Sequence, residues 1–187
     1  LMSLRCDTLA ARIRTPKKVY EVRSVGHGVY AVSELDPSSF LSDKHLEPPQ
    51  KSGLKSKLPP PQEKPSGSGS GPATVDLLVV YTGAAREWAG SSESIRAQID
   101  LAVAETNLAY ELSGIEQRLR LVHTAETSYA ESGTLRTDLE RLTETSDGKM
   151  DQVHAWRDQY GADAVSLLTA TGDNACGIGW QLTDDNY

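Results

Sequence analysis

Four histidines are the first residues of this sequence to consider as ligands or catalysts: His27, His45, His123 and His154. A helical zinc site needs two imidazoles three or four residues apart on one helix face. No two of these histidines have that spacing. We interpret each as a surface or packed histidine, because proteins place histidine there far more often than on a metal. The residues themselves predict no metal site.

Nucleophilic and acid–base catalysis have no clear constellation either. No Gly-x-Ser-x-Gly follows a strand, and the Gly-Ser run at 66–71 precedes a strand, whereas the glycine turn of a dinucleotide site follows one. Nothing in the spacing of the acidic residues selects an acid and a base among Asp76, Asp100, Glu105 and Asp163. No catalytic residue is therefore predicted.

The two cysteines, Cys6 and Cys176, are too few for a disulfide scaffold or a four-cysteine zinc site. Taken alone, Cys176 is either half of a disulfide whose partner is missing or an inert buried thiol. In an exported protein the disulfide half is favoured, because unpaired thiols are disfavoured there.

The elements that must position these residues fall into two units joined by a linker. Seven of the nine prolines lie between Pro48 and Pro72, and the Gly-Ser run follows them, so 42–72 is predicted to be the linker. Residues 1–41 alternate like strands, with a hairpin turn at 26–28 and a further strand at 9–13. Such a short piece cannot enclose a core and must lean on a partner or belong to a larger β unit.

Residues 73–187 predict an α/β domain. The expected order is β-α-β-α-α-β-β, which is typical of a mostly parallel twisted sheet with packed helices. Helices are expected from about Glu93, with Ser92 as N-cap and Gly114 at the end, and then over 135–142 and 150–160. Strands are expected at 75–81, at 119–123, at 164–168 and from Cys176 onward.

The charge distribution argues against nucleic acid as a partner. The net charge of −7 combines 11 basic and 7 acidic residues in 1–72 with 8 basic and 19 acidic ones in 73–187. The acidic body would repel phosphates. No apolar run approaches the roughly 18 residues of a membrane span, so no membrane partner is predicted. No signal peptide opens the sequence, and the true N-terminus is expected upstream.

A series of short strings runs in unbroken order through the second unit, at 75–82, 99–107, 119–123, 131–133, 137–139, 146–148, 160–163 and 176–179. Together they resemble the opening of a metzincin catalytic domain. The similarity is to the bacterial reprolysin-like (adamalysin-like) zinc metallopeptidases, which include the peptidyl-Asp metallopeptidases. The resemblance implies a metzincin-like upper subdomain with an antiparallel edge strand in residues 73–187.

The first unit resembles the end of a reprolysin-type propeptide, through Ser3, Cys6, Leu9 and the strand 20–22. By that resemblance, 1–41 is the β-rich C-terminal piece of the propeptide, and the chain's own propeptide is one of its partners. The linker 42–72 would then be the hinge where the propeptide is cut. Its candidate cleavage residues are Lys51, Lys55, Lys57 and Lys64.

The family's zinc motif, H-E-x-x-H-x-x-G-x-x-H, follows the fourth strand, and this sequence ends at Tyr187 before reaching it. The resemblance therefore implies a secreted zinc metalloendopeptidase that hydrolyses proteins or peptides. Its zinc ligands and catalytic glutamate would lie beyond Tyr187. The 187-residue chain alone is expected to bind no catalytic zinc and to be inactive.

In metzincins the fourth strand borders the cleft, where an extended substrate adds to it through main-chain hydrogen bonds. The resemblance thus implies a substrate-binding rim made of Gly177, Ile178, Gly179, Trp180, Gln181 and Leu182. The alternative is an ordinary edge strand with small residues for close packing. Cys176 would pair with a cysteine near the zinc helix. A role for Cys6 as a latency thiol is disfavoured, because Cys6 lies far upstream of the catalytic unit.

Two other functions compete with the peptidase. One is a secreted, non-catalytic α/β module that binds peptides with its edge strand. The other is an intracellular α/β protein without peptide contact, which is disfavoured because the linker and the propeptide would have no purpose there. An H-E-x-x-H soon after Tyr187 in the reading frame would support the peptidase, and a stop codon would support the peptide-binding module.

Overall fold

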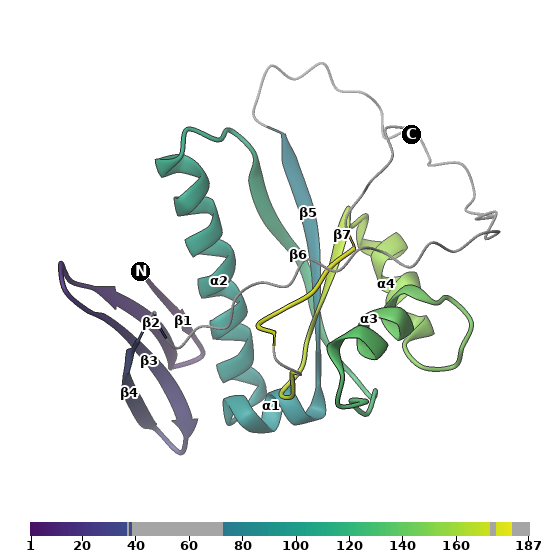
Figure 1. The fold of residues 1–187 in the computed structure, drawn as a ribbon, viewed down its shortest axis with the longest axis horizontal. Coiled ribbons are helices and arrows are strands. Elements are labelled where there is room, and N and C mark those ends of the chain that lie inside the picture. Colours follow the sequence, from purple (N-terminus) through teal and green to yellow (C-terminus); the bar gives the residue numbers. More distant parts are fainter. Residues whose placement is uncertain (37, 39–72, 173–174, 181–187) are drawn as a thin grey trace.

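The chain is arranged in four layers (Figure 1). The structure is a computed structural model that describes residues 1–36, 38, 73–172 and 175–180. An N-terminal sheet packs beside helix α2, a second sheet follows, and helices α3 and α4 cover the far side of that sheet. The predicted linker 42–72, with His45 and the four candidate cleavage lysines, lies outside the described residues. Among the described residues, no helix is long and apolar enough to span a bilayer.

The N-terminal sheet is an antiparallel meander in the order β1-β2-β3-β4. Strands β2 and β3 and the glycine turn between β3 and β4 confirm the predicted strands and hairpin, whereas β1 was not predicted. Cys6 and Asp7 form the turn between β1 and β2 with φ of 45° and 63°, the left-handed pair that tight two-residue hairpins require. The strands are β1 (Met2–Arg5), β2 (Thr8–Arg14), β3 (Val19–Gly26) and β4 (Val29–Leu35).

The face of this N-terminal sheet that contacts α2 carries arginines, whereas the face exposed to water carries large apolar side chains. The strand register places Arg5, Ala10 and Arg12 on the face that contacts α2. The opposite face exposes large apolar side chains, with Met2 71% and Leu4 68% accessible. The expectation that this piece cannot enclose a core is confirmed, because only two of its apolar residues are buried and both are alanines.

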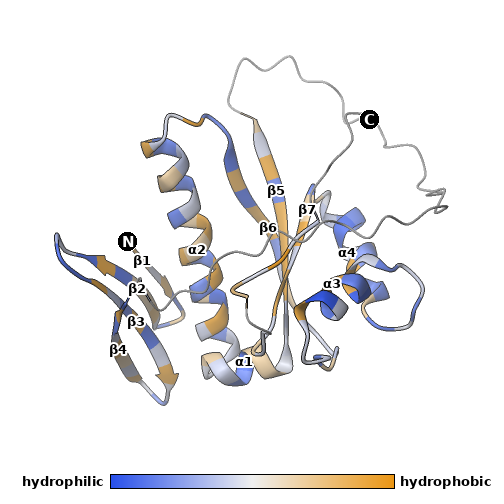
Figure 2. Cartoon of the chain, in the orientation of Figure 1, coloured by the Kyte–Doolittle hydropathy of each residue, from blue (hydrophilic) through white to orange (hydrophobic). Residues whose placement is uncertain are grey.

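The second sheet is parallel, with strand order β6-β5-β7, and consists of β5 (Thr74–Thr82), β6 (Arg118–Thr127) and β7 (Ala164–Leu168). The apolar stretch of β5 after Asp76 is orange in Figure 2. As that run predicts, β5 is buried on both faces: Leu78 and Val80 pack toward α3 and α4, and Val79 and Tyr81 toward α1 and α2.

The helices confirm three predicted segments and add a fourth. They are α1 (Gly83–Ala89), α2 (Ser92–Leu112), α3 (Leu135–Thr143) and α4 (Asp151–Tyr160). The short helix α1 was not predicted. The N-cap of α2 is Ser91 rather than Ser92, because the Ser91 hydroxyl accepts the Ser94 backbone N–H at 3.0 Å. Gly114, with φ of 70°, follows the end of α2 as expected.

Candidate functional site

The carboxyl ends of the three parallel strands are tied together by Glu131, in the loop between β6 and α3. Its carboxylate accepts the Thr82 hydroxyl at 2.5 Å, the Ala170 backbone N–H at 2.8 Å, and both the N–H and the hydroxyl of Thr171 at 3.0 and 2.5 Å. Burial raises the pKa of Glu131, but the hydrogen bonds from Thr171, Thr82 and the two backbone N–H groups outweigh it, and the pKa lies below its usual value. Glu131 therefore fixes the chain that leaves β7.

A second buried carboxylate, Asp138 on α3, holds the same loop. The hydroxyl of Tyr129 donates to Asp138 at 2.5 Å, and the backbone N–H of Ser132 donates to it at 2.9 Å. Arg141 donates to the Tyr129 hydroxyl at 2.9 Å. Burial raises the pKa of Tyr129, and its hydrogen bond to Asp138 raises it further. The loop is therefore held from both sides, by Glu131 and by Asp138.

A cavity of about 660 Å³ lies between α3, β7 and the segment 176–180, and we call it the β7–α3 cleft. Its walls are about equally polar and apolar, and the polar side chains in them include Asp138, Asp163 and Ser166. Trp180 borders it, and its indole N–H donates to the Thr143 hydroxyl at the end of α3, at 2.6 Å. The apolar residues that line it include Leu135, Leu139, Leu142, Val165, Leu167, Leu168 and Ile178.

The structure brings four of the six predicted rim residues, Gly177 to Trp180, to this cleft, while Gln181 and Leu182 lie outside the described residues. The predicted fourth strand is not formed within 175–180. Trp180 is bound to α3 instead, and two glycines in this segment offer no side chains to pack on a sheet. Within the described part of the chain, β7 pairs with β5 alone, so its other edge is an open strand edge.

The cysteines and histidines stay apart in the structure. Cys176 is exposed in the cleft segment and forms no disulfide with Cys6, which lies exposed in the β1–β2 turn. His123 stacks on Tyr160 with ring centroids 3.9 Å apart, and His154 lies 3.0 Å from the Glu144 carbonyl oxygen. Among the described residues, no three His, Cys, Asp or Glu side chains are grouped so that they could hold a metal ion.

The acidic residues considered as acid and base have structural partners. Arg120 binds Asp76 through two hydrogen bonds of 2.7 Å, and Asp163 accepts the Asp76 backbone N–H at 2.9 Å. Asp100 and Glu105 are both on α2 and bind arginines of the N-terminal sheet. Of the four, Asp163 alone lines the β7–α3 cleft, so the structure indicates no acid–base couple among them.

The sequence contained only weak signals for Glu131, Tyr129 and Asp138. Asp138 precedes Arg141 by one helical turn, a spacing that indicates a shared helix face but not burial. Glu131 lies four residues after the end of β6, in the loop at the carboxyl edge of the parallel sheet, where polar groups are common. Neither signal identifies the hydrogen-bond partners.

Comparison with known proteins shows one family. The family model of the reprolysin-like metallo-peptidases, family M12B, matches residues 71–183. A peptidyl-Asp metalloendopeptidase of Xanthomonas campestris pv. campestris is 33% identical over 177 residues, which are 92% of this chain and 40% of that protein. Another of that name, from Pseudomonas aeruginosa, is 37% identical over 126 residues, 64% of this chain and 20% of that protein.

The chain spans about 40% of the length of the first of these relatives. A solved structure entitled "Structure of a chaperone-substrate complex" is 24% identical and matches with a TM-score of 0.48, over 56% of this chain and 19% of that one. That similarity is too low to support an argument about fold or function.

Proposed function

The chain belongs to the reprolysin-like metallo-peptidases of family M12B, and from this premise we propose that it is part of a secreted zinc metalloendopeptidase. Residues 73–187 would be the N-terminal part of the catalytic domain, and residues 1–41 the end of a propeptide. The match over 71–183 is the observation that carries the proposal. The parallel sheet β6-β5-β7, with helices on both faces, is compatible with a metallopeptidase domain.

The described residues do not fit a catalytic zinc site. His27, His123 and His154 come from a turn, a strand and a helix, and none of them joins a group of three potential ligands in the described chain. Three protein ligands are the minimum for catalytic zinc. We therefore propose that the zinc ligands are supplied by sequence beyond Tyr187, and we assign no catalytic step to this chain.

The role proposed for this chain is to bind the substrate. The open edge of β7 offers main-chain hydrogen bonds to an extended peptide, and the β7–α3 cleft offers apolar walls beside it. Gly177 to Leu182 are proposed as the rim that contacts the substrate. Protein or peptide would be the substrate class, because main-chain pairing recognises a backbone and not a particular side chain.

The proposal is tested by comparing the 187-residue chain with the longer product of its reading frame. We expect the longer protein to contain about one zinc per chain and to hydrolyse casein, and the shorter chain to do neither. Metal analysis and release of acid-soluble peptides measure the two properties. Casein hydrolysis by the short chain, or a longer protein without zinc or activity, would contradict the proposal.

Replacing Trp180 by alanine in the longer protein is expected to raise KM for a peptide substrate about tenfold, because an aromatic wall of the cleft is lost. The matched control is Trp88→Ala, which removes an exposed tryptophan on α1. Steady-state kinetics of both variants measure the effect. An unchanged KM for Trp180→Ala, or an equal change in both variants, would remove Trp180 from the substrate rim.

The open edge of β7 also supports a second function, a non-catalytic module that binds peptides. This module and the peptidase differ in one measurable property. A peptide-binding module would bind the peptides of a casein digest, which isothermal titration measures. Neither the 187-residue chain nor the longer protein would then cleave these peptides. Hydrolysis by the longer protein decides for the peptidase.

A further inference from the structure

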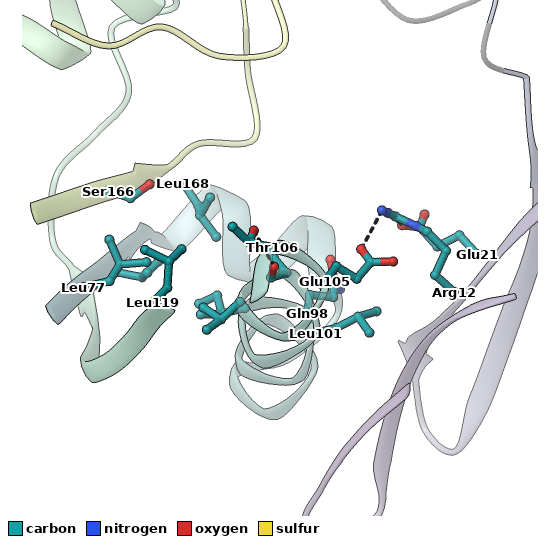
Figure 3. Close-up of a pocket in the computed structure, with 14 residues that line it drawn as sticks. Arg12, Glu21, Leu77, Gln98, Leu101, Glu105, Thr106, Leu119, Ser166 and Leu168 are labelled. Atoms are coloured by element: carbon teal, nitrogen blue, oxygen red, sulfur yellow. Dashed lines mark hydrogen bonds and ion pairs between the residues drawn. The ribbon is translucent and has the colours of Figure 1, made fainter. Parts of the chain in front are cut away.

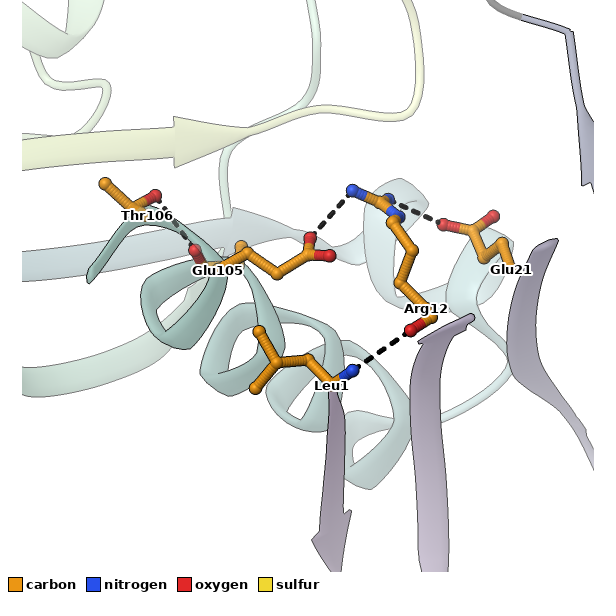
Figure 4. A network of polar contacts seen from close by, with 6 residues as sticks. Leu1, Arg12, Glu21, Glu105 and Thr106 are labelled. Carbon is orange, nitrogen blue, oxygen red and sulfur yellow. Dashed lines mark hydrogen bonds and ion pairs between the residues drawn. The ribbon is translucent and has the colours of Figure 1, made fainter. Parts of the chain in front are cut away.

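The N-terminal sheet turns a charged face toward helix α2. Arg12 and Glu21 on this face lie near α2, beside a cavity of about 350 Å³ that they help to line (Figure 3). Arg12 donates to Glu105 of α2 at 2.7 Å and to Glu21 of the neighbouring strand β3 at 3.3 Å (Figure 4). Arg5 binds Asp100 of α2 at 2.9 Å. These charges are therefore paired inside the chain.

The opposite face of the sheet, directed away from α2, is apolar across all four strands, and we call it the outer face. A row of directly paired residues crosses it from β1 to β4 and consists of Met2, Ala11, Val22 and Val32. Paired residues of neighbouring strands point to the same side of a sheet, so this row is one continuous apolar surface. The most exposed apolar side chains of the outer face are Met2, Leu4, Ile13, Tyr30 and Val32.

The polarity of the two faces is the reverse of the usual one. An antiparallel sheet that packs on a helix normally turns its apolar side chains inward and its polar side chains to water. Here the exposed apolar side chains of the outer face amount to on the order of 600 Å², whereas patches above a few hundred Å² on a protein surface usually mark an interaction site. The outer face is therefore expected to bind a partner.

The polar groups of the outer face are already satisfied within the chain. Of the strand residues that the structure places on this face, only Glu34 is charged, and Lys18 of the same sheet binds it at 2.7 Å. The Tyr30 hydroxyl donates to the Asp7 carbonyl oxygen at 2.9 Å and accepts the Leu9 backbone N–H at 3.3 Å. A polar partner would lose its hydration here without compensation, so the outer face favours a partner that is itself apolar.

A second copy of this chain is such a partner. Two identical faces without net charge can meet on a two-fold axis with no like charges opposed. Two antiparallel sheets also pack well face to face, as they do in a β-sandwich. The contact would bury about 1,200 Å² in total, which is the lower end of the range for specific protein interfaces.

We propose that the outer face is the interface of a homodimer, in which the N-terminal sheets of two chains pack face to face. Each sheet keeps its own α2 on the other side. The β7–α3 cleft lies beyond α2, so the dimer leaves this cleft accessible (Figure 1). The dimer forms whether or not the longer protein is a peptidase.

The mass of the 187-residue chain in solution tests the dimer. We expect sedimentation equilibrium to give twice the mass of one chain at about 100 µM and the mass of one chain at about 1 µM, because a small interface without charge pairs binds weakly. A single-chain mass at both concentrations would overturn the proposal. A mass that rises beyond two chains would do the same, because a closed two-fold contact stops at the dimer.

Two single substitutions distinguish packing of faces from pairing of strand edges. Leu4→Lys lies on β1 and Val32→Lys on β4, the two edge strands of the sheet. Each is expected to weaken dimerisation at least tenfold, because the lysine would be buried without a partner. Leu112→Lys is the control, since it replaces an exposed leucine at the end of α2, outside the sheet. A loss in only one of the two sheet variants, or an equal loss in the control, would contradict packing of the outer faces.

The two methionines of the chain, Met2 and Met150, report the same contact without a substitution. Met2 lies on the outer face, whereas Met150 is fully buried in the core beside β5. Oxidation by hydrogen peroxide depends on exposure, so raising the concentration from about 1 to about 100 µM should slow sulfoxide formation at Met2 several-fold and leave Met150 protected throughout.

An equal oxidation rate of Met2 at both concentrations would overturn the dimer. Protection of Met2 at both concentrations in the longer product of the reading frame would also overturn it, because the chain itself would then cover the outer face.

Discussion

Replacing Leu78 by alanine is expected to lower the free energy of unfolding by about 4 kcal/mol. Leu78 is fully buried in the central strand β5 and packs in the core formed with α3 and α4. The substitution removes buried apolar surface and leaves a cavity that neighbours on a central strand cannot fill, because the strand is fixed by partners on both sides. Urea unfolding followed by circular dichroism measures the loss.

The same substitution at Leu112, which is 79% exposed at the end of α2, is the control and should change the free energy of unfolding by less than about 0.5 kcal/mol. Leu78→Met preserves the volume and should cost less than about 1.5 kcal/mol, so it remains measurable if the alanine variant is unfolded. Similar losses at Leu78 and Leu112 would contradict the central position of β5 in the core.

Replacing Glu131 by glutamine is expected to destabilise the chain by about 2 to 3 kcal/mol, because the carboxylate accepts hydrogen bonds from three residues on two other segments. Glutamine keeps one oxygen but presents an N–H₂ group to donors, so some of these donors lose their acceptor. The region after β7 should loosen first, and faster amide hydrogen exchange at 169–172 measures this. Glu126→Gln is the control, because Glu126 is exposed and bound only to Arg86.

The pH dependence of stability depends on the same carboxylate. The pKa of Glu131 is lowered in the folded chain, so its contribution is complete above the usual pKa of about 4.3 and is lost as the pH falls through the folded value. Unfolding free energies measured from about pH 6 down to about pH 3 should therefore fall less steeply in Glu131→Gln than in the wild type. Parallel slopes would show that Glu131 is not charged and hydrogen-bonded as described.

The elements with strong periodicity could be predicted from the sequence. The nearly continuous apolar run at 75–81 predicted a strand buried on both faces, and β5 is such a strand. Helix α2 was predicted from its apolar spacing, with an error of one residue at its cap. Glycine with a left-handed conformation marked the ends of α2 and α4, at Gly114 and Gly161.

Elements that depend on distant contacts could not be predicted. Helix α1 has only seven residues, which are too few to show a helical periodicity of apolar side chains, and it begins with glycine. Strand β1 is held by pairing with β2 and by Arg5, whose partner Asp100 is 95 residues away. The strand expected from Cys176 is not formed within the described residues 175–180, where Trp180 binds Thr143 of α3. In each case tertiary contacts override the local pattern.

The candidate site was only partly accessible from the sequence. The family resemblance predicted a substrate-binding rim at 177–182, and the structure places 177–180 at the β7–α3 cleft. The contact of these residues with substrate stays a prediction. Glu131 and Asp138 were missed as loop anchors because acidic residues are usually solvated, and only the fold shows that hydroxyl and backbone donors converge on them.

The exposed apolar face of the N-terminal sheet makes that sheet dependent on its contact with α2. Met2, Leu4 and Val32 already face water while the sheet lies on α2, and leaving α2 would expose Ala10 as well. A piece of this size has too little interior to stay folded without a support. Off α2 the sheet should therefore lose its fold, and self-association through its exposed apolar strands would compete with its return to α2.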